Sequence, residues 1–217
     1  MINSTFGRNM DKDFLSLFSF DITPYTKEVE YRRGETILSS GGDGGNLIYI
    51  REGGSRCSYI YPDGVLTALD YAPAPAIYGE LELLGVQKYT ALVEAVTDAA
   101  AYSVNTLPIK EKLLSDAVFL RKLVEYTARK LFRVNMQMAS SLSFPLRKRL
   151  AGYILDHERD GIYTMSHGEA SAYLCVSYRH LLHVFSTFES EGLIERKSRG
   201  LYIVRNRRAL ERERIEC

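Results

Sequence analysis

The side chains that could hold a metal ion or react are few and scattered. His180 and His183 stand three residues apart, which would place both on one helix face, but no third ligand follows at a suitable spacing. Cys57, Cys175 and Cys217 are widely separated and odd in number. That pattern argues against a disulfide framework and against a four-cysteine metal or cluster site within one chain. We therefore predict no metal site and interpret the cysteines as structural thiols.

Acidic residues do not make a convincing catalytic centre. Glu80 and Glu82 lie in the N-terminal half, yet residues 27–103 contain no histidine. A metal-dependent enzyme built on this segment would need histidines and carboxylates in one cluster. Nothing in the sequence pairs these acids with a nucleophile or a base, and we predict that the protein is not an enzyme.

Polar residues between positions 165 and 185 form a pattern that suits contact with DNA. Ser166 and Glu169 have the spacing of a capping box, which begins one helix, and Ser177 can cap a second helix directly afterwards. Apolar residues of the second helix recur on one side and leave a polar outer face. Chance helix pairs look similar, so the pattern is a hypothesis. The candidate DNA contacts are Ser177, Tyr178, Arg179, His180, His183, Lys197 and Arg199.

Two short strands around a basic turn follow the second helix, over residues 191–204, as in the wing of a winged helix-turn-helix. Lys197 and Arg199 of this turn are expected to bind phosphate. Arg179 is the best candidate to read guanine, because a guanidinium can pair with both O6 and N7. We predict a recognition helix over about 177–190 that enters the major groove.

A long helix must precede this domain. Residues 113–141 contain neither proline nor glycine, and apolar or small residues recur at alternating steps of four and three, as in a heptad repeat. Such a helix extends about 45 Å, more than its neighbours need for their own cores. We favour a parallel homodimeric coiled coil, and the alternative is a helix packed wholly on its own β domain. The predicted seam consists of Leu120, Val124, Thr127, Leu131, Val134 and Met138.

Short β segments interrupted by glycine fill residues 27–103 and indicate a small β-sandwich or barrel. Pro145 breaks the long helix and suits the first turn of the next one, which places a hinge at residues 143–145. We therefore predict an α+β chain in three parts. Residues 1–107 form a β-sandwich or barrel domain, residues 108–144 the dimerisation helix and hinge, and residues 145–217 the winged helix-turn-helix.

Charge and hydropathy fit this division. The chain has a net charge of +1. Residues 145–217 carry 13 Lys and Arg against 10 Asp and Glu, whereas residues 1–144 carry 15 against 17. The modest basic excess at the C-terminal end permits binding to DNA. No signal-like segment and no run of 18 apolar residues occurs, so we expect a cytoplasmic protein without membrane contact.

The order of these parts resembles the Crp/Fnr superfamily of bacterial transcription regulators over about Phe14 to Leu210. The segment Gly79-Glu-Leu-Glu-Leu-Leu-Gly85 with Ala91-Leu-Val-Glu-Ala95 looks like the family's phosphate-binding cassette. The segment Val176-Ser-Tyr-Arg-His-Leu-Leu-His-Val184, followed by Arg199-Gly-Leu-Tyr-Ile-Val-Arg-Asn-Arg, is most similar to the YeiL-type branch. The resemblance implies a jelly-roll-like β-roll of the cyclic-nucleotide-binding type, a homodimer, double-stranded DNA as partner, and RNA polymerase as partner if the regulator activates.

The resemblance also places a candidate effector pocket at the cassette, in the segment that the family uses to hold a cyclic phosphate and ribose. Its residues are Gly79, Glu80, Leu81, Lys88, Tyr89 and Thr90. The family's Gly-Glu pair is matched, but Tyr89 and Thr90 stand where its Arg-Ser pair would be. Lys88, just before them, carries a point charge and lacks the bidentate fork of arginine. The resemblance thus implies an unidentified small-molecule effector other than cyclic AMP, or a retained turn that no longer binds nucleotide, and it assigns no certain cofactor.

The recognition helix also departs from the family pattern. Tyr178, Arg179 and His183 occupy the places of its Arg-Glu…Arg signature, so a different operator is expected. Residues 1–30 contain no cysteine, so the iron–sulfur mode of redox-sensing members is not carried over. We predict a homodimeric regulator on a near-palindromic operator. The alternative is a small-ligand-binding signalling module that acts through protein partners, whose DNA affinity would lack a steep salt dependence.

Overall fold

The structure is a computed structural model that describes residues 10–214, apart from residues 43, 89, 175 and 199. Two predicted site residues, Tyr89 and Arg199, lie outside the described residues. The chain divides into two compact units, Met1–Leu131 and Phe132–Cys217. The first half of the long helix α4 (Ala117–Ser143) therefore belongs to the first unit and its second half to the second unit.

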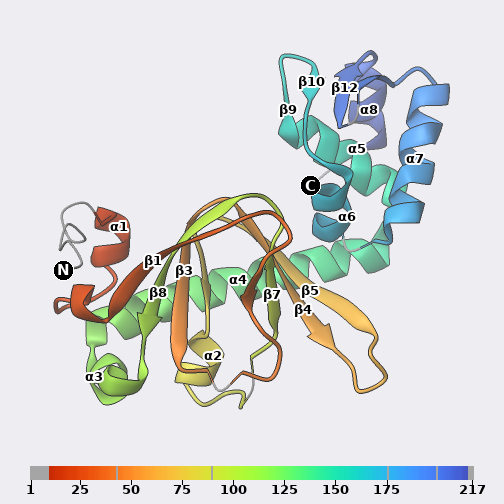
Figure 1. Cartoon of the computed structure of the whole chain (residues 1–217). Coiled ribbons are helices and arrows are strands. Elements are labelled where there is room, and N and C mark those ends of the chain that lie inside the picture. The colour runs from red at the N-terminus through yellow and green to blue at the C-terminus, as the bar shows by residue number, and fades with distance from the viewer. Residues whose placement is uncertain (1–9, 43, 89, 175, 199, 215–217) are drawn as a thin grey trace. The chain divides into compact units, whose positions relative to one another are not determined.

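The first unit is built on two four-stranded antiparallel sheets, ordered β1-β8-β3-β6 and β2-β7-β4-β5 (Figure 1). The strands are β1 (Thr26–Tyr31), β2 (Thr36–Leu38), β3 (Asn46–Glu52), β4 (Gly54–Ile60), β5 (Leu66–Pro73), β6 (Ala76–Tyr78), β7 (Leu92–Ala95) and β8 (Ala99–Asn105). The helices beside them are α1 (Lys12–Leu15), η1 (Thr23–Tyr25), α2 (Glu80–Leu83), η2 (Leu107–Ile109) and α3 (Lys110–Ser115). The predicted β-roll and the α+β fold class are confirmed.

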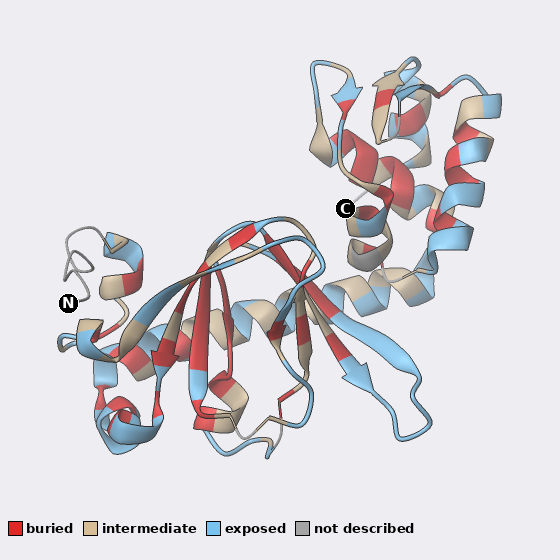
Figure 2. Cartoon of the chain, viewed as in Figure 1, coloured by how far each residue is buried: buried red, intermediate tan, exposed pale blue. Residues whose placement is uncertain are grey.

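Strand β3 is buried on both faces, which explains its continuous apolar run. Ile48 and Ile50 point into the core between the two sheets, whereas Leu47 and Tyr49 point into a second core on the opposite face. This division follows from the two-residue period of a strand. The second core contains Phe119 of α4, so the strand and the helix are held together by apolar packing. Figure 2 shows the buried run of β3 in red.

The long helix begins later than the sequence predicted. Asp116 has an extended backbone, and its Oδ1 accepts hydrogen bonds from the N–H groups of Val118 (2.9 Å) and Phe119 (3.2 Å). A side-chain acceptor of this kind satisfies the free N–H groups of a helix start. The expected single helix from residue 113 is therefore two helices, α3 and α4, and the absence of proline and glycine did not reveal the break.

Helix α4 packs on its own unit with one side and exposes the predicted seam on another. Phe119 and Leu123 are buried, whereas Val124, Leu131 and Met138 are 65%, 62% and 58% exposed. The other seam residues are half-buried: Leu120, Thr127 and Val134. The Thr127 hydroxyl donates to the Leu123 carbonyl at 2.8 Å, so its polar group is satisfied within the helix. One chain alone thus leaves the heptad stripe largely uncovered.

Beyond the end of α4, the described residues of the second unit form helices α5 to α8 and a small sheet ordered β11-β12-β10-β9 (Figure 1). Its elements are α5 (Leu146–His157), β9 (Glu158–Arg159), β10 (Ile162–Tyr163), α6 (His167–Tyr173), α7 (Tyr178–Ser190), β11 (Ile194–Ser198), β12 (Leu201–Val204) and α8 (Arg207–Glu213). One apolar core joins them, with Leu150, Phe185 and Leu210 fully buried. Helix α8, which is capped by Asn206, was not anticipated from the sequence.

Candidate nucleic-acid interface

Two local caps fix the starts of α6 and α7. The Ser166 N–H donates to Glu169 Oε2 at 2.7 Å and the Glu169 N–H donates to Ser166 Oγ at 3.2 Å, so the predicted capping box is formed. The Ser177 Oγ accepts from the His180 N–H at 3.3 Å, as expected for the cap of α7. Each contact joins residues three positions apart, so short-range chemistry sets where both helices begin.

Helix α7 turns a continuous apolar stripe inward. Leu181, Phe185 and Phe188 are at most 1% exposed, and Val184 is also buried. The predicted DNA-contacting residues occupy the other side and are all exposed: Ser177, Tyr178, Arg179, His180 and His183. Because the stripe fixes the rotation of the helix, these polar side chains are presented together to solvent. Arg179 forms no ion pair within the described part of the chain.

The wing, defined as β11, β12 and the turn between them, is more paired than the sequence suggested. Lys197 Nζ forms an ion pair with Glu195, and Arg205 Nε donates to the same carboxylate at 2.6 Å. These hydrogen bonds lower the pKa of Glu195. Lys197 remains exposed, but binding to a phosphate would exchange one anionic partner for another. Glu195 and Arg205 were not identified as site residues, because a cross-strand pair depends on the hairpin register.

A buried histidine, His167, contacts both α7 and strand β12 of the wing on their inward sides. His167 Nε2 lies 2.8 Å from the Tyr202 hydroxyl, which joins the start of α6 to strand β12. The Phe185 ring of α7 lies 4.6 Å from the His167 ring and 5.0 Å from the Tyr202 ring, between ring centres. These three aromatic side chains therefore position α7 against the wing. Sequence reasoning missed them, because inward-facing aromatic residues look like ordinary core.

The C-terminal end of α7 is fixed by an arginine of α5. Arg147 donates through Nη1 to Glu191 Oε1 at 2.9 Å and through Nη2 to Glu213 Oε1 at 2.9 Å. This pairing raises the pKa of Arg147 and lowers the pKa of Glu191. The Arg147 side chain also lies over the Phe188 ring, 5.0 Å from its centre. Arg147 is thus a positioning residue for α7.

The cassette, residues 79–95 of the first unit, makes internal contacts with its polar groups. Gly79 has a φ of +87°, and a Cβ there would lie 2.2 Å from the Asn46 carbonyl oxygen, so only glycine fits. Glu80 is buried and its Oε1 lies 3.0 Å from Lys130 Nζ of α4. That carboxylate raises the pKa of Lys130. Lys130, 50 residues away in the sequence, therefore neutralises Glu80.

The remaining described residues of the predicted pocket differ in their exposure. Thr90 is buried, and its Oγ1 accepts from the Gly42 N–H at 3.0 Å and donates to the Ser39 carbonyl. Leu81 is half-buried and Lys88 is exposed. Thr90 thus fastens a neighbouring loop instead of presenting its hydroxyl to solvent.

Of the three cysteines, Cys57 lies within the described residues, whereas Cys175 and Cys217 lie outside them. Burial raises the pKa of the Cys57 thiol to about 11, so the reactive thiolate is scarce at neutral pH. No group of three or more potential metal ligands occurs within the described residues. No helix among those residues is long and apolar enough to cross a membrane.

Comparison with known proteins gives a consistent picture. A family model described as the Crp-like helix-turn-helix domain matches residues 148–213. The regulatory protein YeiL of Escherichia coli O157:H7 is 30% identical over 197 residues, which cover 91% of this chain and 90% of that protein. The crystal structure of TTHB099, a CRP-family transcriptional regulator of Thermus thermophilus, is 27% identical with a TM-score of 0.69, and the match covers 85% of this chain and 95% of that one.

A more distant structure supports the fold alone. FixK2 of Bradyrhizobium japonicum is 18% identical, with a TM-score of 0.68, over 88% of this chain and 98% of its own. Together these matches span both units of the chain.

Proposed function

Because the chain belongs to the Crp/Fnr family of transcription regulators and is similar to YeiL, we propose that it acts as a homodimer on a near-palindromic operator in double-stranded DNA. The observation that carries this proposal is the exposed polar face of α7, which lies opposite a fully buried apolar stripe. Its relatives are transcription regulators, and we propose no enzymatic activity for it.

In this proposal α7 enters the major groove and Arg179 reads guanine. The Arg179 guanidinium is exposed at the start of the helix, and bidentate pairing with O6 and N7 is the commonest specific contact of arginine with a base. Tyr178, His180 and His183 supply further base or phosphate contacts. Lys197 of the wing binds a phosphate in place of Glu195. Breaking its ion pair with Glu195 costs little free energy, because both side chains are exposed to solvent.

The dimer forms through the exposed seam of α4. Val124, Leu131 and Met138 recur every seven residues and are each more than half exposed in one chain, as the a positions of a coiled coil would be. A parallel pair would present two copies of α7 to half-sites about 34 Å apart.

Control by an effector would act through α4. A change in the β-roll alters the register or splay of the Leu120–Met138 seam, and the Ser143–Pro145 hinge passes this change to α7. Lys130, which contacts Glu80 of the cassette, supplies a physical link between the cassette and this helix. The missing Arg-Ser pair supports an effector other than cyclic AMP. RNA polymerase is the further partner if the regulator activates transcription.

The test is selection of genomic DNA fragments by purified protein at several salt concentrations, with Arg179→Ala alongside. We expect affinity to fall steeply as salt rises, because phosphate contacts release counterions. We also expect Arg179→Ala to abolish sequence enrichment. Arg33→Ala is the matched control, since it removes an exposed arginine from β-roll residues far from α7 in sequence.

Equal enrichment by wild type and Arg179→Ala would contradict the assigned readout. Salt-independent or absent DNA binding would favour the signalling module that acts through protein partners. Separately, Leu131→Glu should yield monomers in analytical ultracentrifugation. An intact dimer of this variant that still binds operator would contradict the proposal that the seam forms the dimer interface.

A further inference from the structure

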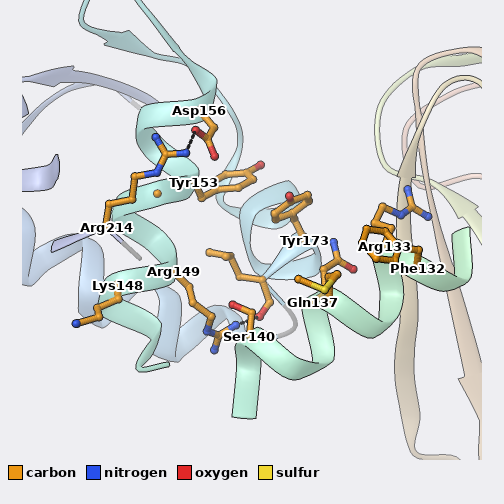
Figure 3. Close-up of a pocket in the computed structure, with 13 residues that line it drawn as sticks. Phe132, Arg133, Gln137, Ser140, Lys148, Arg149, Tyr153, Asp156, Tyr173 and Arg214 are labelled. Atoms are coloured by element: carbon orange, nitrogen blue, oxygen red, sulfur yellow. Dashed lines mark hydrogen bonds and ion pairs between the residues drawn. The ribbon is translucent and has the colours of Figure 1, made fainter. Parts of the chain in front are cut away.

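A cavity of about 440 Å³ lies within the second unit, between the second half of α4 and helix α5 (Figure 3). Its volume falls in the range of small-molecule sites, which is about 300–1,000 Å³. Neither the predicted seam nor the exposed face of α7 contributes to its lining. The proposed function leaves this cavity unused.

Aromatic and aliphatic groups form much of its wall. The Tyr153 and Tyr173 rings lie side by side, with centres 4.9 Å apart, as Figure 3 shows. Phe132 and Met136 of α4 also line the cavity and are 68% and 54% exposed, so their apolar surface is open to a bound molecule. Such walls favour a flat, apolar body.

A glycine in the middle of α5 keeps the cavity open. Gly152 lines it, although glycine is a poorer helix former than alanine in the interior of a helix. The backbone of Gly152 does not have the positive φ that would require glycine. A Cβ there would lie 3.6 Å from Arg214 Cγ, an ordinary contact. Neither strain nor crowding therefore explains this glycine, whereas a larger side chain would project into the cavity.

The polar groups of the lining favour a negatively charged ligand. Four cationic side chains line the cavity with one acid, Asp156. Arg149 is oriented by a hydrogen bond from Nη1 to the Leu174 carbonyl at 2.6 Å. Arg214 pairs with Asp156 at 2.8 Å, but both side chains are about half exposed, so this pair is easily exchanged. The Gln137 Nε2 is buried and has no hydrogen-bond partner among the described residues, and it would donate to an anion.

The cavity stays accessible in the proposed dimer. With about 100° of rotation per residue, Phe132, Met136 and Gln137 lie about 100°, 140° and 120° around α4 from Leu131, off the line of the seam. A partner helix on the seam would therefore not fill it.

We propose that this cavity binds a small aromatic anion, with the ring against Tyr153 and Tyr173 and the anionic group toward Arg214. Because its walls come from both α4 and α5, on either side of the break at residues 143–145, a bound molecule would restrain the angle between these helices.

The test is isothermal titration of the full chain, without DNA, with 1-naphthoate and with neutral 1-naphthalenemethanol. We expect one saturable site per chain, and binding of the acid about tenfold tighter than binding of the alcohol, because charge-assisted hydrogen bonds are stronger. Equal affinity for the two probes, or no saturable binding of the acid at millimolar concentration, would overturn the proposal.

Variants locate the site. Gly152→Leu fills the cavity with a better helix former and should remove binding of both probes, whereas Gly152→Ala should retain most of it. Arg214→Gln should weaken the binding of the acid by about tenfold and leave the binding of the alcohol unchanged. The control is Arg208→Gln, which removes an exposed arginine of helix α8 that does not line the cavity and should change the binding of neither probe. Unchanged binding of the acid by both Gly152→Leu and Arg214→Gln would also overturn the proposal.

Discussion

Charged side chains are exposed on the outer face of α7, whereas the cassette buries a charged side chain in an ion pair. Arg179 is exposed and forms no ion pair among the described residues, while short-range caps and a buried stripe hold its helix. Glu80 is buried and already pairs with Lys130 of the same chain. An exposed side chain such as Arg179 can contact a ligand directly and contributes little to the stability of the fold. A buried pair such as Glu80 with Lys130, here called the inward pair, stabilises the fold, and its charges are less available to a ligand.

The largest expected effect comes from breaking the inward pair. Lys130→Met would leave the Glu80 carboxylate buried without its partner, which we expect to lower the free energy of unfolding by about 3–5 kcal/mol. The double variant Lys130→Met with Glu80→Leu should recover most of this loss, because an apolar pair replaces the ion pair. Urea unfolding measures both, and Lys122→Met on the exposed side of α4 is the control. A single variant as stable as the wild type would show that the pair is not a stabilising contact.

Removing a cap tests the local contacts that hold α7. Ser177→Ala deletes the acceptor for the His180 N–H and should destabilise the protein by about 1 kcal/mol. Ser190→Ala, at the other end of the same helix, removes a hydroxyl that does not cap its start. Thermal unfolding of the two variants should differ, and equal midpoints would argue that packing alone positions α7.

The outward region should tolerate loss of its charge. Arg179→Ala should change the free energy of unfolding by less than about 0.5 kcal/mol, as exposed substitutions usually do. Its effect should be confined to DNA. A clear loss of stability in urea unfolding would mean that Arg179 has a structural partner, and the contrast with Glu80 would fail.

The smallest effect concerns Glu191, whose pKa is lowered chiefly by hydrogen bonds from Arg147. A lowered carboxyl pKa contributes stability at pH above its ordinary value of 4.5, and this contribution is lost as the pH falls through the lowered pKa. Unfolding of the wild type should therefore become more pH-dependent below about pH 4.5 than that of Glu191→Gln. Parallel pH profiles for the two proteins would contradict this coupling.

Local signals made most of the fold predictable. The caps at Ser166 and Ser177, the stripe of α7 and the break at Pro145 involve residues at most a few positions apart, and each lies where the sequence placed it. The contacts that were missed join distant segments, such as Lys130 with Glu80 and His167 with Tyr202. A single sequence does not reveal such pairs, because they depend on how sheets and helices pack. The candidate DNA contacts remain predictions, and Tyr89 and Arg199 lie outside the described residues.

Helix α4 takes part in several contacts and proposed contacts at once, which should limit the substitutions that it tolerates. One side of the helix is buried on the β-roll at Phe119 and Leu123, another carries the exposed heptad stripe, and a third, in its second half, lines the cavity. Few positions remain that are free of any contact or proposed contact. In a saturation mutagenesis library scored for operator binding, the exposed positions of α4 should therefore accept fewer substitutions per position than the exposed turn at residues 61–65.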